Sequence, residues 1–404
     1  MKLLGGLFRV LGSYGLACVL LLDLFLLTLF GTLYQVEAGL FEAQKLYFES
    51  WFVVQRSPVP LVLPGGMLCM GLLAVNLFAG GFVRIQKSKR TVGVMVVHTG
   101  IALLLASAFV KLYHSEDGKL VLWEPLRDAR GTVMEPGEVS DEFESYYLWE
   151  VAIWDANQKG PLEEHVIPNE HLVDLVEGRT RTFTSPTLPF TLELASFLRN
   201  CRPLPKGPKW TAESPEVGGY ALEQIEDALE AEHNVAGLTA RFRERAGGSE
   251  RTDILWGFER YPTTFEVEGK TWAVHLRHTR YSMPFSIRLE DFRKEDHPGL
   301  TMARSFESDV VKIVAGREEA VRIQMNEPLR ADGLVLFQSS WWPQDGPPEA
   351  RVQSVFSVVR NPSDYWPLYA CIVIGVGLLI AFVPKLLQFG RSQEKRRAQS
   401  GVPA

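Results

Sequence analysis

Four apolar spans and one wide polar gap dominate this sequence. The spans cover residues 11–33, 59–83, 91–110 and 365–384, and Asp23 is the charged residue that interrupts the first. Each span is long enough to cross a bilayer as a helix, which takes roughly 20 apolar residues. The segment between the third and fourth spans has an ordinary soluble composition. The pattern predicts an integral membrane protein with four transmembrane α-helices, three N-terminal and one C-terminal, and a large domain in water between them.

Basic residues beside the spans predict the orientation, because lysine and arginine concentrate on the cytoplasmic side of membrane proteins. They cluster in three places, which are the N-terminal end with Lys2 and Arg9, the loop 84–90 and the tail 385–397. With four crossings, these three places lie on the same side of the membrane. We therefore expect cytoplasmic N- and C-termini and a large domain on the outer side.

The spans also divide the chain into expected domains. We expect a membrane anchor over residues 1–112, an extracytoplasmic domain over 113–362, and a closing helix with a basic tail over 363–404. Within the anchor, the aromatic residues of 35–58 are typical of an amphipathic segment at the membrane interface. A cleaved signal peptide is the alternative for the first span, but its apolar core is long and no small-x-small cleavage pattern follows.

Cysteine spacing and charge exclude several classes of function. Cys18, Cys69 and Cys371 lie in apolar spans, so the outer domain holds Cys201 alone and has no internal disulfide. The sequence contains no C-x-x-C, which argues against a dithiol oxidoreductase, and no C-x-x-C-H, so the chain is not itself a c-type cytochrome. The net charge of −6 comes without a dominant basic patch, so nucleic-acid binding has no support.

Alternating apolar and polar residues predict that the outer domain is rich in β-strands, as a sandwich or an open barrel. The alternation is typical of half-buried strands and occurs in segments 148–155, 264–269, 271–278, 333–341 and 355–362. Segments 188–197 and 283–292 resemble each other, and either duplication of one β-unit or chance convergence explains them. The composition of 203–250, with Ala, Glu and Leu at helical spacing in 220–233, predicts a partly helical insertion.

His98 is the leading candidate for a functional residue. It lies inside the third apolar span, roughly 12 Å along a helix axis from the basic loop that ends at Arg90. An ionisable residue at this depth is a functional candidate by default, and neutral imidazole binds metals and haem iron. A hydrogen bond between packed helices, helped by Thr99 and Gly100, is the alternative.

Other polar and aromatic residues carry weaker hypotheses. Asp23 faces the helix bundle in either a packing role or a pair with His98, which would orient the imidazole ring. Trp341 and Trp342 form either a platform for a flat macrocycle or ordinary core packing. The outer histidines read as surface or turn residues, and none has zinc spacing. His275 and His278 lie three apart on an expected strand, so they point to opposite faces.

Several segments, taken in order along the chain, resemble the ResB family (CcsB-type) of system II cytochrome c biogenesis. They are FGTLYQ at the end of the first span, the H-x-G run that begins at His98, LPFTLELASF, MPFSIRLEDF with the segment that follows it, GLVLFQSSW, and SVFSVVRNPSDYW before the last span. The arrangement of three spans, a large domain and a fourth span is also similar to that of the family. Asp23 and the charged insertion are departures from its pattern.

The resemblance implies a function in a bacterial cytoplasmic membrane. Members of this family form a complex with a ResC/CcsA-type polytopic partner that carries a tryptophan-rich haem-handling segment. That complex is thought to move haem outward and present it for thioether attachment to apocytochrome c. A transmembrane histidine, here His98, would be an axial ligand of transiently bound haem b. The chain would be an accessory subunit, and a separate thiol-reducing protein would reduce the apocytochrome.

A second class of function stays open on the sequence alone. The chain is also compatible with a membrane-anchored extracytoplasmic sensor or assembly scaffold without haem. The β-rich domain would then bind a peptide or a protein, and His98 would only pack against a neighbouring helix. Haem content of the purified protein separates the two classes.

Overall fold

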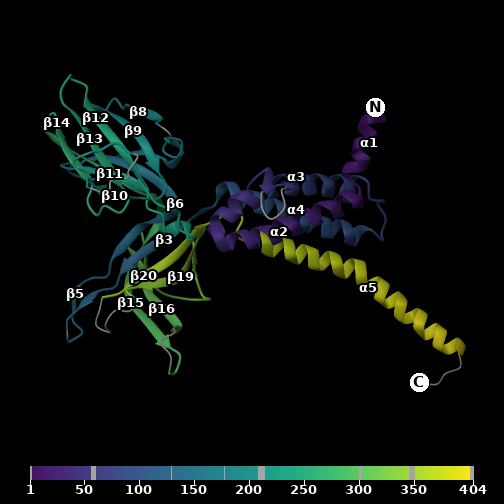
Figure 1. The fold of residues 1–404 in the computed structure, drawn as a ribbon. Coiled ribbons are helices and arrows are strands. Elements are labelled where there is room, and N and C mark those ends of the chain that lie inside the picture. Colours follow the sequence, from purple (N-terminus) through teal and green to yellow (C-terminus); the bar gives the residue numbers. More distant parts are fainter. Residues whose placement is uncertain are drawn as a thin grey trace. The chain divides into compact units, whose positions relative to one another are not determined.

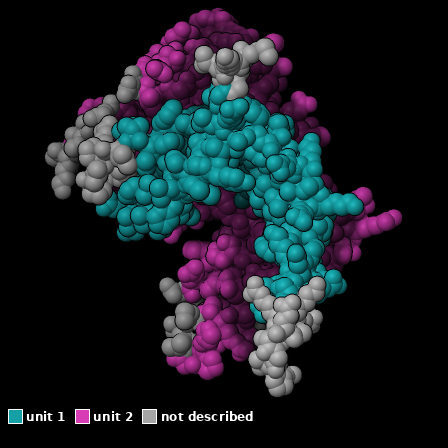
Figure 2. All heavy atoms as spheres, turned by 90° about the vertical axis from the view of Figure 1, so that its right-hand side faces the viewer, with its two compact units in different colours: residues 1–115, 361–404 teal, residues 116–360 magenta. Residues whose placement is uncertain are grey.

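A computed structural model describes residues 2–55, 61–128, 130–176, 178–207, 214–299, 303–344 and 351–400. The chain divides into two compact units (Figure 2). One unit is helical and combines Met1–Ser115 with Asn361–Ala404, and the other is built of β-strands and covers Glu116–Arg360.

The helical unit contains four helical stretches that are long and apolar enough to cross a membrane: Tyr14–Phe48, Gly66–Val83, Val92–His114 and Trp366–Gln393. Its elements are α1 (Lys2–Leu11), α2 (Tyr14–Ala43), the π-helical turn η1 (Gln44–Phe48), the hairpin β1 (Phe52–Gln55) and β2 (Leu61–Pro64), α3 (Gly66–Asn76), the π-helical turn η2 (Leu77–Val83), α4 (Val92–His114) and α5 (Trp366–Ser400). The four apolar helices expected from composition are therefore present (Figure 1).

The first predicted span has a more complex structure than one helix. The helix breaks between α1 and α2, where the Ser13 hydroxyl accepts a hydrogen bond from the Leu16 backbone N–H and so caps α2. A second break follows at Gly39, whose φ of 81° is accessible to glycine at little cost. The segment 35–58 thus begins inside α2 and continues as η1 and strand β1. Residues 56–58 of that segment lie outside the described residues.

Small residues bring α4 and α5 into close contact. A Cβ atom added at Gly100 would lie 2.5 Å from Ile374 Cγ1, and one added at Gly377 would lie 2.7 Å from the backbone nitrogen of Val97. Close approach of this kind through glycine is the usual way in which apolar helices pack in membranes. Near the C-terminal end of α4, the Ser363 hydroxyl donates a hydrogen bond of 3.0 Å to the Ser107 carbonyl oxygen.

The β-unit contains a ten-stranded and a four-stranded sheet. The strand order of the large sheet is β17-β16-β15-β6-β3-β20-β19-β18, with β14 on β15 and β7 on β6, and that of the small sheet is β13-β12-β9-β8. The strands are β3 (Glu116–Trp123), β4 (Leu126–Arg127), β5 (Val133–Glu135), β6 (Val139–Asp155), β7 (Glu164–Ile167), β8 (Thr180–Phe183), β9 (Phe190–Leu198), β10 (Cys201–Pro205), β11 (Tyr220–Gln224), β12 (Gly237–Glu244), β13 (Glu250–Trp256), β14 (Thr263–Val267), β15 (Lys270–Asp296), β16 (Ala303–Val314), β17 (Arg317–Gln324), β18 (Leu329–Ala331), β19 (Leu334–Trp342) and β20 (Gln353–Arg360). This unit confirms the prediction of a large β-rich domain.

Two hydrophobic cores lie in the β-unit, and the long strands β6 and β15 contribute to both. The first core contains residues of the small sheet together with Val151 and Val274, which lie where β6 pairs with the first half of β15. The second contains Phe143 of β6 and Ile287 of β15 with the apolar residues of β3, β19 and β20. The two similar segments contribute one to each core, and duplication of a β-unit stays a hypothesis.

The prediction of a partly helical insertion over 203–250 is wrong. Residues 220–233 form strand β11, a loop and the single 3₁₀ turn η4 (Ala231–His233), and most of 236–246 forms strand β12. β12 pairs with β9 and β13 and buries Leu238, Ala240 and Phe242, which alternate along the strand. Burial in the sheet thus outweighs the helix propensity of Ala, Glu and Leu. Residues 208–213 lie outside the described part of the chain.

Candidate functional site

His98 lies in the second turn of α4, where its partly buried ring contacts the end of η2. Its Nδ1 atom is 3.3 Å from the carbonyl oxygen of Gly81. The ring also meets that of Phe82 edge-on, with 6.3 Å between the centroids. The imidazole therefore contacts two consecutive residues of one π-helical turn, which ends the preceding apolar helix.

Gly81 makes this contact possible because it has no side chain. A Cβ atom at Gly81 would lie 2.6 Å from His98 Nδ1, closer than real Cβ atoms come to a neighbour. Gly81 also lies in the last turn of its helix, where carbonyl groups lack intrahelical donors. Gly81 is not among the candidate residues predicted from the sequence, although the pair Gly80–Gly81 is visible at the end of an apolar span.

Asp23 lies in a different contact from His98. Its side chain is buried in α2 beside the Cys69 side chain of α3, and the Cys69 thiol donates to the Leu20 carbonyl oxygen over 3.2 Å. Asp23 Oδ2 has no hydrogen-bond partner among the described residues. Of the two roles considered, the structure shows helix packing, and the pair with His98 is not formed.

Two histidines of β15 are more buried than a surface residue. His278 stacks on Trp149, with ring centroids 3.9 Å apart, and burial lowers the pKa of its imidazole to about 4. The Nε2–H group of His275 donates to the carbonyl oxygen of Glu259 over 3.1 Å, and burial lowers its pKa as well. The prediction of a surface residue is thus wrong for His278, whose ring packs on Trp149, whereas His275 is half-buried beside Glu259.

Trp341 and Trp342 end strand β19 and differ in their surroundings. Trp341 packs against Phe306, with ring centroids 4.9 Å apart, whereas the more exposed Trp342 meets Trp123 edge-on at 6.1 Å. Both line an open hollow of about 720 Å³, together with Lys119, His233, Ser340, Pro343, Gln344 and Val355. The pair is therefore part core packing and part surface.

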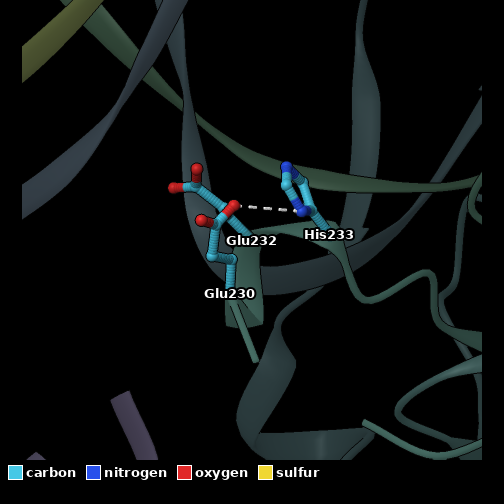
Figure 3. A group of neighbouring side chains, drawn as sticks. All are labelled: Glu230, Glu232 and His233. Atoms are coloured by element: carbon cyan, nitrogen blue, oxygen red, sulfur yellow. Dashed lines mark ion pairs between the residues drawn. The ribbon is translucent and has the colours of Figure 1, made fainter. Parts of the chain in front are cut away.

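His233 has neighbours of ligand type in the structure. Glu232 lies beside it on η4 and Glu230 directly precedes that turn, and one ligand atom from each of the three residues falls within 4.8 Å of the others (Figure 3). All three side chains are exposed, and His233 Nδ1 lies 3.3 Å from a Glu230 carboxylate oxygen. Exposed pairs of this kind contribute little to stability.

One buried ionic group stabilises the centre of the β-unit. The Arg277 guanidinium on β15 donates to Glu150 on β6 over 2.9 Å and also to both carboxylate oxygens of Glu164 on β7. Burial raises the pKa of Glu150, and the Arg277 hydrogen bond opposes that rise. The group joins three neighbouring strands of the large sheet, so its evident role is structural.

The fold and the site together define a class of protein. In this chain, four apolar helices, one of them with an embedded imidazole, are joined to a large β-rich domain. The sequence profile of the ResB-like family matches residues 87–353, which is more than half of the chain, and the chain therefore belongs to the ResB-like family. The matched region begins just before α4 and includes His98. No curated protein matches the chain.

Family membership agrees with the resemblance found in the sequence. It is consistent with involvement in cytochrome c biogenesis, and the four apolar helices are consistent with a membrane protein.

Proposed function

We propose that this chain is a subunit of a membrane complex that delivers haem and assembles cytochrome c, with His98 as an axial ligand of transiently bound haem b. The observation that carries the proposal is the imidazole of His98, partly buried in an apolar helix and fixed by one backbone carbonyl. In a histidine metal ligand, one ring nitrogen usually makes a hydrogen bond and the other binds the metal. The residues present therefore fit haem.

Haem and the chain would contribute different parts of the function. Haem, when bound, supplies the iron that takes an imidazole nitrogen and the vinyl groups that become thioethers. The chain would supply His98 as ligand, Phe82 and Gly81 as its fixed surroundings, and apolar helices that exclude water from it. His98 lies near the basic loop 84–90, which we place on the cytoplasmic side, so haem would enter from that side.

The β-unit would serve assembly rather than chemistry. With cytoplasmic termini, this unit lies outside a bacterial cytoplasmic membrane, where cytochromes c are completed. We assign it the binding of apocytochrome c or of a ResC/CcsA-type partner, which would carry the tryptophan-rich haem-handling segment. A thiol-reducing protein would act separately, because the chain has no C-x-x-C.

A deletion strain tests the proposal. We expect loss of holocytochrome c when the gene is deleted, measured by haem staining of membrane proteins. The wild-type gene should restore it, and a His98→Ala gene should restore much less although the protein accumulates to the same level. Normal cytochrome c maturation in the deletion strain would rule out this function and favour a scaffold or sensor without haem.

A further inference from the structure

The partner of His98 determines which of its nitrogens carries the proton. A carbonyl oxygen has no hydrogen to donate and can only accept. The contact between His98 Nδ1 and the Gly81 oxygen is 3.3 Å, slightly longer than the usual hydrogen bond of about 2.7–3.2 Å, and as a hydrogen bond it places a proton on Nδ1. In the neutral ring, Nε2 is then the nitrogen with a free lone pair. A metal ligand needs that lone pair.

The π-helical turn η2 places this carbonyl where His98 can reach it. Such turns are rare and occur frequently at functional sites. The turn ends at Val83, and the Arg84 N–H bonds back to the carbonyl oxygen of Ala79 over 3.0 Å. The Arg84 side chain in turn donates to the carbonyl oxygens of Arg9 and Gly12, over 2.9 Å and 2.8 Å. These hydrogen bonds connect the end of η2 to the end of α1.

We infer that Gly81 is a positioning residue for His98. Its carbonyl holds the imidazole as the Nδ1–H tautomer, and its missing side chain lets the ring approach, so that Nε2 is prepared as the ligand atom before any ligand binds. The ligand, haem, rests on the proposed function, whereas the tautomer is a property of the chain by itself. Gly81 lies outside the region that matches the family profile.

Nitrogen NMR of the haem-free protein tests the tautomer directly. The full chain, with ¹⁵N-labelled histidine rings, is placed in lipid nanodiscs at about pH 8.5, two units above the ordinary imidazole pKa. The His98 signals are identified as those missing from a His98→Asn variant. We expect a protonated Nδ1 and an unprotonated Nε2. An Nε2–H tautomer in the wild-type protein, which is the commoner form of free histidine, would overturn the inference.

A pair of glycine variants tests the positioning. Gly81→Ala introduces a methyl group 2.6 Å from Nδ1 and should convert the His98 signals to a mixture of tautomers or to the Nε2–H form. Gly71→Ala is the matched control, because a Cβ there meets nothing within 4 Å, and it should leave the signals unchanged. An unchanged tautomer in a folded Gly81→Ala protein would contradict the role of Gly81.

Haem titration of the same two variants separates the inference from the proposed function. We expect Gly81→Ala to bind haem about tenfold more weakly than Gly71→Ala, the usual size of an effect transmitted through a ligand's hydrogen-bond partner. If the chain binds no haem but His98 is the Nδ1–H tautomer, the proposed function fails and the positioning stands. If haem binds through His98 and the tautomer is Nε2–H, the positioning fails alone.

Discussion

Single residues decide which imidazole nitrogens of this chain are available. At His98, the Gly81 carbonyl occupies Nδ1. At His278, the ring stacks on Trp149, and Nδ1 is buried without a hydrogen-bond partner among the described residues. The two histidines are similarly accessible but differ in their surroundings. A hydrogen bond orients the ring of His98, whereas burial keeps the ring of His278 neutral.

The low pKa of His278 predicts that the β-unit loses stability in acid. The folded pKa is about 4, whereas an unfolded histidine titrates near 6.5. Between these values the unfolded chain binds more protons, so the free energy of unfolding falls as the pH falls from about 6.5 to 4. His278→Gln cannot take up this proton. Between pH 6.5 and 4, its free energy of unfolding should therefore fall by up to about 3 kcal/mol less than that of the wild-type protein. Urea unfolding of the full chain, followed by tryptophan fluorescence, checks this, and parallel curves would contradict it.

A second prediction at the scale of a residue concerns Arg277. Arg277→Met would leave Glu150, which is only 4% exposed, without its cation. Removing one partner of a buried ion pair costs about 3–5 kcal/mol. Arg243→Met, which removes an exposed pair with Glu250, should cost less than about 1 kcal/mol. Equal loss of stability in both variants, measured by denaturant unfolding, would contradict this account.

At the scale of elements, glycine contacts decide how α4 and α5 pack. Gly100→Leu would bring side-chain atoms onto Ile374 and onto the carbonyl oxygen of Ala370, which lie 2.5 Å and 2.9 Å from an added Cβ. We expect the protein to lose about 1–3 kcal/mol of stability and to aggregate at a lower temperature in detergent, scored by size-exclusion chromatography. Gly375→Leu on α5, where an added Cβ meets nothing within 4 Å, should behave like the wild-type protein. Identical heating curves would show that these helices do not depend on the close contact.

The sequence predicted elements well where one physical signal dominates. Apolar length identified the four helices, and period-two alternation identified strands such as those at 148–155 and 271–278. The prediction was wrong at 220–233, because the local helix propensity favoured a helix whereas pairing within the sheet favours strands. The pair Gly80–Gly81 is visible in the sequence, but the contact of the Gly81 carbonyl with His98 could not be predicted from it, since the extra residue of a π-helical turn shifts which carbonyl faces which helix. The contacts of His98 depend on which carbonyl group of η2 faces α4.

At the scale of the whole molecule, the proposed orientation follows from the basic ends of the spans. It predicts which residues are accessible from outside the cell. In a background without Cys18 and Cys371, a membrane-impermeant maleimide should label Glu268→Cys, in the exposed turn before β15, in intact cells. Ser88→Cys, in the basic loop, should be labelled only after permeabilisation. The reverse pattern would invert the topology and contradict entry of haem from the cytoplasmic side.

The visible absorption spectrum of the purified chain, co-expressed with a ResC/CcsA-type partner, tests the central claim most directly. The account predicts a haem Soret band that weakens severalfold in His98→Ala and recovers when imidazole is added, because free imidazole can replace the missing ligand. A complex without a Soret band, or a band that does not change with His98, would contradict the assignment of His98 as a haem ligand.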